Sequence, residues 1–162
     1  LPGSGKSTVA DQLATVTGVP VLSVDPVEDG MHGAGIPPSF ERGLAAYLVV
    51  AAVAEHLLGL GQRVIVDACN AEPEGRAIWS DLGERAGVAP TWVQVSCSDA
   101  ALHRARLAAR GARYEGVPEP SWDEVQARAA GFVGWDDARL EVDTAGDLDD
   151  VLAAVRRHVG VD

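Results

Sequence analysis

The chain has 162 residues, 47% of them hydrophobic and 23% charged, a composition that indicates a folded globular protein and excludes a disordered one. Its formal net charge of −11 disfavours a long nucleic-acid partner, because the sequence has no basic stripe to replace the counterions of the phosphates. Two cysteines are too few for a disulfide framework and fit a reducing, cytoplasmic location.

The first ten residues, LPGSGKSTVA, match all but the first glycine of the phosphate-loop pattern G-x-x-x-x-G-K-[ST]. In such a loop the backbone N–H groups surround phosphate oxygens, the lysine reaches the β- and γ-phosphates, and the next hydroxyl binds Mg²⁺. Lys6 is the only lysine among 13 Lys and Arg residues, which favours a specific need for an ammonium group there. A glycine-rich turn before a helix is the alternative. The predicted nucleotide-binding residues are Gly3, Ser4, Gly5, Lys6, Ser7 and Thr8.

Hydrophobic periodicity and turn residues predict that strands alternate with helices along the rest of the chain. We expect helices over 7–17, 39–60, 73–86, 100–110, 121–132 and 148–159, and strands over 20–25, 63–68, 91–97 and 139–145. The stretch 26–39 is rich in Gly and Pro and is expected to be a loop. Residues 111–120 are expected to form a connector within a lid region at about 100–120. The apolar run 44–54 is too short to span a membrane and is expected to lie in a buried helix.

This alternation predicts an α/β fold, a single domain over residues 1–162 with a parallel sheet covered by helices on both faces. Ligands of such sheets bind at the carboxyl ends of the strands. Asp25 ends one predicted strand and could accept the proton of an attacking hydroxyl; alternatively it only begins a turn. Asp67 ends the next predicted strand and could orient Mg²⁺; alternatively it caps the following loop.

A third set of polar residues lies on later elements. Arg106 and Arg110 are four residues apart on one helix face and could clamp phosphates when a lid closes, although a solvated helix surface would show the same spacing. Asn70 could hold either its own loop or a substrate. His32 and His103 have no ligand spacing, and no role is predicted for them.

The segments GSGKST, VLSVD, VIVDACNAEPEGRAIW, HRARLAARG and LEVDTA, in this order, resemble the small P-loop kinases of the AAA_33 type. That group includes relatives of zeta toxin, chloramphenicol phosphotransferase and the kinase half of polynucleotide kinase. The resemblance covers essentially the whole chain. It implies a three-layer P-loop fold with strand order 2-3-1-4-5, ATP and Mg²⁺ as cofactors, and phosphoryl transfer to a hydroxyl. The strand before the phosphate loop is missing from the given sequence, so we expect it to be an N-terminally truncated fragment.

The resemblance also implies roles for individual residues. It makes Lys6 and Ser7 the phosphate and Mg²⁺ residues, Asp25 the base, Asp67 the strand-end acid, Arg106 and Arg110 the lid pair, and Asn70 and Arg76 recurrent polar positions after the third strand.

The chain departs from several relatives on the acceptor side. Where they have a basic residue three positions after the base, this chain has Glu28, followed by Asp29. Together with Glu41, these acids favour a neutral or cationic hydroxyl compound. The predicted acceptor-side residues are Glu28, Asp29, Arg42, Asn70 and Arg76.

The sequence thus predicts an ATP-dependent kinase that phosphorylates a small-molecule hydroxyl, with no nucleic-acid or membrane partner. One alternative is a switch protein that binds and hydrolyses ATP without an acceptor. The other is a nucleotide or polynucleotide kinase, which the acidic charge disfavours.

Overall fold

The computed structural model describes residues 1–111 and 113–161, so residue 112 of the expected connector lies outside the described residues. The chain forms two compact units. Unit 1 consists of Leu1–Val19, Thr91–Gly111 and Pro120–Asp162, and unit 2 of Pro20–Pro90 and Ala112–Glu119. The chain therefore passes between the units four times. Because neither unit is a continuous segment, the single domain stays a prediction.

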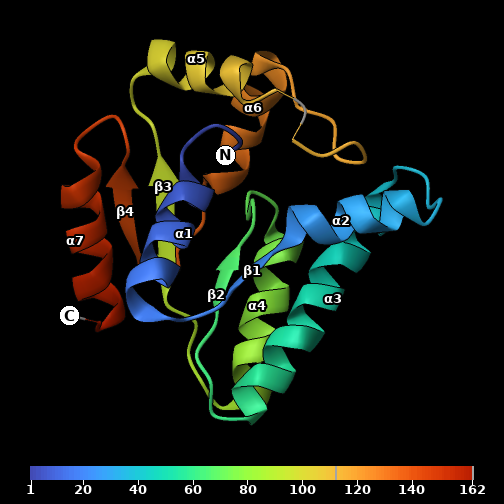
Figure 1. Cartoon of the computed structure of the whole chain (residues 1–162), viewed down its shortest axis with the longest axis vertical. Helices are drawn as coiled ribbons and strands as arrows, with labels where there is room; N and C mark the ends of the chain where they lie inside the picture. Colours follow the sequence, from blue (N-terminus) through green and yellow to red (C-terminus); the bar gives the residue numbers. More distant parts are fainter. Residues whose placement is uncertain (112, 162) are drawn as a thin grey trace. The chain divides into compact units, whose positions relative to one another are not determined.

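Unit 1 combines helices with one pair of parallel strands. Its elements are α1 (Lys6–Thr17), β3 (Trp92–Ser96), α5 (Ala100–Arg110), α6 (Trp122–Ala129), the 3-10 helix η1 (Ala130–Phe132), β4 (Arg139–Asp143) and α7 (Leu148–Val159). Strands β3 and β4 pair from Trp92 opposite Arg139 to Ser96 opposite Asp143. Helix α7 contacts β4, and α1 contacts both α7 and β3 (Figure 1). These two helices therefore cover the sheet with their apolar residues, as α/β packing requires.

Among its described residues, unit 2 has a second parallel pair and three helices. Its elements are β1 (Val21–Ser23), α2 (Val24–Gly33), α3 (Phe40–Gly59), β2 (Ile65–Asp67) and α4 (Pro73–Ala86). Strands β1 and β2 end with Ser23 opposite Asp67. Helix α3 contacts α2, α4 and β1 (Figure 1), and its residues Ala46, Val50 and Ala54 are buried.

The predicted α/β class with parallel strands is confirmed. The pairs β1–β2 and β3–β4 correspond to the second and third strands and the fourth and fifth strands of the expected order, which stays a prediction as a whole. Helices α4, α5 and α7 have the predicted bounds because their ends carry local signals. Asp99 and Asp147 accept hydrogen bonds from the first amides of α5 and α7, and Gly87 and Gly160 end α4 and α7 in the left-handed conformation.

The prediction for residues 20–39 is wrong in one respect. Strand β1 ends at Ser23, and residues of the expected loop form helix α2 instead. Asp25 therefore lies in the first turn of a helix rather than at the end of a strand. A carboxylate is stabilised there by the positive end of the helix, and Pro26, also in that turn, loses no hydrogen bond. The glycines and prolines of this stretch suggested a loop, but those within the short helix lie near its ends, Pro26 in the first turn and Gly30 and Gly33 in the last.

Helix α3 contains the apolar run 44–54 within a longer segment. By length and composition alone, its 20 residues, with a mean hydropathy of 1.3, are enough to cross a membrane. Only one of its faces is buried, as in many core helices, whereas Leu48, Val49 and Val53 on the other face are exposed. The helix expected to be buried is thus buried on one side.

Candidate functional site

The first residues of unit 1 form a tight loop that leads into α1. Gly3 and Gly5 have positive φ angles of 78° and 90°, which glycine adopts without steric cost. Gly5 is the N-cap of α1, so the N-cap residue has no side chain with which to cap this helix start. Amides at such a start carry partial positive charge and bind anions. The Lys6 ammonium and the Ser7 hydroxyl follow, 3.5 Å apart, so amide, ammonium and hydroxyl groups are gathered on one turn.

His103 of α5 supports this loop. It is 4% exposed, and its Nε2 donates a hydrogen bond to the carbonyl of Pro2 at 2.8 Å. Its ring meets the Trp122 ring edge to face, with 5.1 Å between the centroids. A Cβ atom on Gly3 would lie 3.1 Å from the imidazole. Position 3 thus requires glycine for two reasons, its backbone conformation and the space that His103 fills.

The two arginines of the predicted lid pair lie one turn apart on α5. Arg106 donates hydrogen bonds to the hydroxyl of Thr144 at 2.9 Å and to the carbonyl of the same residue at 3.1 Å. Arg110 is the last residue of α5 and is half-buried. The structure therefore ties Arg106 to the residue that follows β4. The nucleotide contacts of both arginines stay a prediction.

Two carboxylates lie at the carboxyl end of the sheet in unit 2. Asp67 ends β2, is 6% exposed, and accepts a hydrogen bond from the Ser23 hydroxyl at 3.3 Å. Asp25 lies in the first turn of α2, directly after β1, and is half-buried. Because Ser23 and Asp67 are opposite each other in a parallel pair, both predicted acids belong to one edge of this sheet.

The loop after β2 is held by side chains of α4. Arg76, 9% exposed, donates hydrogen bonds from Nη1 to the carbonyls of Asn70 at 2.9 Å and Ala71 at 2.7 Å. The Asn70 amide oxygen accepts a hydrogen bond from the Trp79 indole at 2.8 Å. These contacts fix the path of the chain next to Asp67. A role of Asn70 and Arg76 toward an acceptor stays a prediction.

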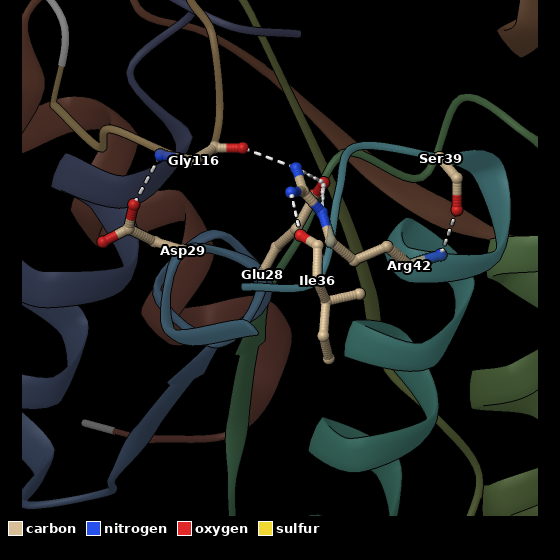
Figure 2. Close-up of polar contacts among 6 residues, drawn as sticks. All are labelled: Glu28, Asp29, Ile36, Ser39, Arg42 and Gly116. Atoms are coloured by element: carbon tan, nitrogen blue, oxygen red, sulfur yellow. Dashed lines mark hydrogen bonds and ion pairs between the residues drawn. The ribbon is translucent and has the colours of Figure 1, made fainter. Parts of the chain in front are cut away.

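Arg42 of α3 is the centre of a buried polar cluster in unit 2 (Figure 2). Its side chain is 1% exposed. The guanidinium donates hydrogen bonds to Glu28 Oε1 from Nε at 3.3 Å and from Nη2 at 3.0 Å, and to the Ile36 carbonyl at 3.0 Å. Its Nη2 also donates to the Gly116 carbonyl at 2.5 Å. A buried guanidinium requires such partners, because desolvation of its charge is costly.

The same cluster fixes both backbone polar groups of Gly116. Its N–H donates to Asp29 Oδ1 at 2.7 Å, while its carbonyl accepts from Arg42 (Figure 2). A Cβ atom on Gly116 would lie 2.1 Å from the Cβ of His32, so no other residue fits here without movement. The acids Glu28 and Asp29 thus have partners within unit 2, and a role in acceptor recognition stays a prediction for them and for Arg42.

Within residues 1–111 and 113–161, no group of three or more His, Cys, Asp or Glu side chains is placed to hold a metal ion. The predicted Mg²⁺ residues are of another type, a single hydroxyl and a single carboxylate. Mg²⁺ accepts such oxygen ligands together with water and substrate phosphates, so Ser7 and Asp67 fit this ion by their chemistry.

The model of the AAA_33 family, described as an AAA domain, matches residues 1–132 of this sequence. The chain belongs to the AAA_33 family. The match includes the phosphate loop, both carboxylates and α5, which confirms the resemblance seen in the ordered segments.

Relatives of this AAA_33 domain are longer proteins. Uncharacterized proteins of Mycobacterium tuberculosis and Mycobacterium bovis are each 32% identical to it, over 90% of this chain and 30% of their own length. The chain thus spans about 30% of the length of these curated relatives.

Solved structures share the fold of the AAA_33 domain. A Chloroflexus aurantiacus protein provisionally assigned as a kinase has a TM-score of 0.73 and 22% identity, covering 97% of this chain and 93% of its own. A sugar kinase from Janibacter has a TM-score of 0.70 and 16% identity, covering 99% and 91%. The APS kinase of Mycobacterium tuberculosis, solved with AMPPNP and APS, has a TM-score of 0.66 and 22% identity, covering 99% and 93%. These likenesses show a P-loop kinase fold.

His103 and Thr144 are residues near the phosphate loop that sequence patterns do not indicate. Both contact the phosphate loop or its neighbours from positions more than 100 residues away in the chain, as the separation of 101 between His103 and Pro2 shows. Hydrophobic periodicity and motif spacing report local structure, so they do not reveal such contacts. The single signal in the sequence is the placement of Thr144 near the carboxyl end of a predicted strand, 139–145.

Proposed function

We propose that this AAA_33 domain is an ATP-dependent kinase that transfers the γ-phosphoryl group of ATP to a hydroxyl of a small molecule. The observation that carries this proposal is the loop formed by Gly3 and Gly5. It leads into helix α1, whose N-cap is Gly5, and the chain's only lysine follows it. The buried Ser4 hydroxyl has no hydrogen-bond partner among the described residues, which fits a loop whose further partner is a ligand or water.

In the proposed reaction the acceptor oxygen forms a bond to the γ-phosphorus, and the bond from that phosphorus to the bridging oxygen of ADP breaks. Asp25 takes the hydroxyl proton as general base. Lys6 and the loop amides stabilise the charge on the phosphates, with Arg106 and Arg110 as further proposed contacts. Ser7 and Asp67 would hold Mg²⁺, which when bound neutralises phosphate charge.

A small-molecule acceptor is supported by the similar structures. Proteins of this fold include one named as a sugar kinase, one named as a gluconokinase and one named as an APS kinase. The net charge of −11 disfavours a nucleic acid as acceptor. A cytoplasmic location is proposed on the two cysteines, neither of which forms a disulfide.

The test is transfer of label from γ-labelled ATP to a library of hydroxyl compounds. Lys6→Ala should abolish transfer. Asp25→Asn should slow it by about 10²-fold or more and leave ATP binding intact, because a general base acts on the chemical step. Asp81→Asn, which changes an exposed acid of the same unit, is the matched control and should have no effect.

The alternatives give different results. ATP consumption that responds to no hydroxyl compound would favour the switch protein, and transfer to nucleotides or oligonucleotides alone would favour the nucleotide or polynucleotide kinase. If the Asp25→Asn variant transfers the label at the wild-type rate, Asp25 has no role in the mechanism.

A further inference from the structure

Thr144, the residue after β4, makes hydrogen bonds with three other segments of unit 1. Its hydroxyl donates to the carbonyl of Ser4, with 2.7 Å between the oxygens, and lies 3.1 Å from the carbonyl of Ser96. The same hydroxyl accepts from Arg106 Nη1 at 2.9 Å. Its backbone N–H donates to Ser96 at 2.9 Å, and its carbonyl accepts from Arg106 at 3.1 Å. With 6% exposure, Thr144 is a buried junction of the loop, β3 and α5.

The hydroxyl has one proton, so its donation to one carbonyl limits donation to the other. The shorter distance, to Ser4, indicates where the stronger bond lies. The Arg106 guanidinium donates to the same oxygen, and a hydroxyl that accepts from a charged donor is polarised into a better donor itself. Arg106 thus strengthens the contact between Thr144 and the phosphate loop.

The contact with Ser4 sets the direction of the next amide. A trans peptide is planar, and its C=O and N–H groups point in opposite directions. Because Thr144 holds the Ser4 carbonyl, the N–H of Gly5 must point away from Thr144. The amides of a phosphate nest bind their ligand only when they point the same way, toward the anion.

The methyl group of Thr144 also shapes the loop. A Cβ atom on Gly5 would lie 3.2 Å from Thr144 Cγ2, and the φ angle of Gly5 is 90°. Thr144 therefore presents its methyl group to one side of Gly5 and its hydroxyl to the preceding carbonyl. Valine would keep the methyl contact and lose the hydrogen bonds of the hydroxyl, whereas serine would keep these hydrogen bonds and lose the methyl contact.

We propose that Thr144 is a positioning residue of the nucleotide site. Its hydroxyl, supported by Arg106, holds the Ser4 carbonyl so that the Gly5 amide is oriented for a polyphosphate. This inference rests on the proposed function in one respect, that the ligand of the loop is a nucleotide. It assigns Arg106 a part in shaping the loop that is separate from the predicted lid contact.

The test is calorimetric titration with MgADP, which measures nucleotide binding without any acceptor. Thr144→Val should weaken MgADP binding by about 5- to 10-fold, the effect of one hydrogen bond. Thr144→Ser should bind within about twofold of the wild type, since the hydroxyl remains. Thermal unfolding measured on both variants separates loss of binding from loss of the fold.

A second variant keeps the inference testable if Thr144→Val does not fold. Arg106→Met leaves the Thr144 hydroxyl in place without its charged donor, and should weaken MgADP binding by about threefold. Arg157→Met removes an exposed arginine of the same unit and should leave the affinity unchanged.

Three results would overturn the inference. The first is an affinity of Thr144→Val for MgADP within twofold of the wild type. The second is an equal loss of MgADP affinity in the valine and serine variants. The third applies if the valine variant does not fold, and is an MgADP affinity of Arg106→Met equal to that of Arg157→Met. These results leave the kinase proposal untouched, whereas a wild-type chain that does not bind MgADP would contradict both proposals.

Discussion

Arg42 in unit 2 and Arg106 in unit 1 both help to hold a loop, but the hydrogen-bond partners of the two arginines differ in charge. In unit 2, Arg42 is 1% exposed and pairs with the carboxylate of Glu28 while it holds Gly116. In unit 1, Arg106 is half-buried and acts on Ser4 through the neutral hydroxyl of Thr144. A buried ion pair is costly to break, whereas a hydroxyl contact is weak and adjustable. We therefore expect Arg42 to determine stability and Arg106 to determine ligand binding.

The largest effect on stability should come from Arg42→Met, which leaves the Glu28 carboxylate without its cation. We expect the free energy of unfolding to fall by about 3 kcal/mol in urea denaturation. The double variant Arg42→Met/Glu28→Leu should recover much of this loss, because no uncompensated charge remains.

The control is Arg85→Met, which breaks the pair with Glu55 in the same unit. Both side chains of this pair are about half exposed, at 51% and 45%. An exposed pair contributes little, so the urea midpoint should hardly change. Equal losses for Arg42→Met and Arg85→Met would contradict the comparison.

The next largest effect on stability should come from a change at Gly116, whose carbonyl accepts a hydrogen bond from Arg42. Gly116→Ala introduces a Cβ atom 2.1 Å from His32 Cβ, so the segment must move. Overpacking of this kind costs about 1–3 kcal/mol. Trypsin should then cleave faster after Arg113 than in the wild type.

Gly30→Ala is the matched control, because a Cβ atom on Gly30 meets nothing within 4 Å. It should leave the cleavage rate after Arg113 unchanged and make the helix slightly more stable. Unchanged cleavage in Gly116→Ala would show that this backbone contact does not restrain the segment.

A smaller effect is expected from Arg106→Met. Its hydrogen bonds go to neutral oxygens of Thr144, so the free energy of unfolding should fall by only about 1 kcal/mol. A loss in urea denaturation as large as that of Arg42→Met would remove the distinction between the two arginines.

The smallest effect is a pH dependence in unit 1. The pKa of Asp143 is lowered, chiefly by the Ser98 hydroxyl, then by the amides of Ala145 and Ser98, and by the charge of Arg106. The ionised carboxylate of Asp143 therefore stabilises the fold at neutral pH. This contribution is present above about pH 3.9, the ordinary pKa of aspartate, and is lost as the pH falls below that value and through the lowered pKa of the folded state. Asp143→Asn should make the thermal midpoint less sensitive to pH between about 5 and 3. A thermal midpoint of Asp143→Asn that depends on pH as in the wild type would contradict this prediction.

Local signals explain which parts of the fold could be predicted from sequence. The phosphate loop and helix α4 were predictable because glycines, a lysine, Pro73 and Gly87 mark them within a few residues. Helix α2 was missed because its proline and glycines are also turn residues, and only contacts with α3 decide between a helix and a loop. The surroundings of Arg42 and Thr144 depend on residues far away in sequence, which no local pattern reports.

The hydrogen bond between Thr144 and Ser4 has a consequence for synthesis of the chain. Its two residues are 140 positions apart, so the phosphate loop cannot reach its final shape until Thr144 has been made. At about 5–20 residues per second, that takes roughly 7–28 s after the loop itself leaves the ribosome's catalytic centre. Such a long-range contact also slows folding, because the intervening chain must be ordered first. Nucleotide binding is therefore expected to appear during translation only after Thr144 has been synthesised, well after the phosphate loop itself.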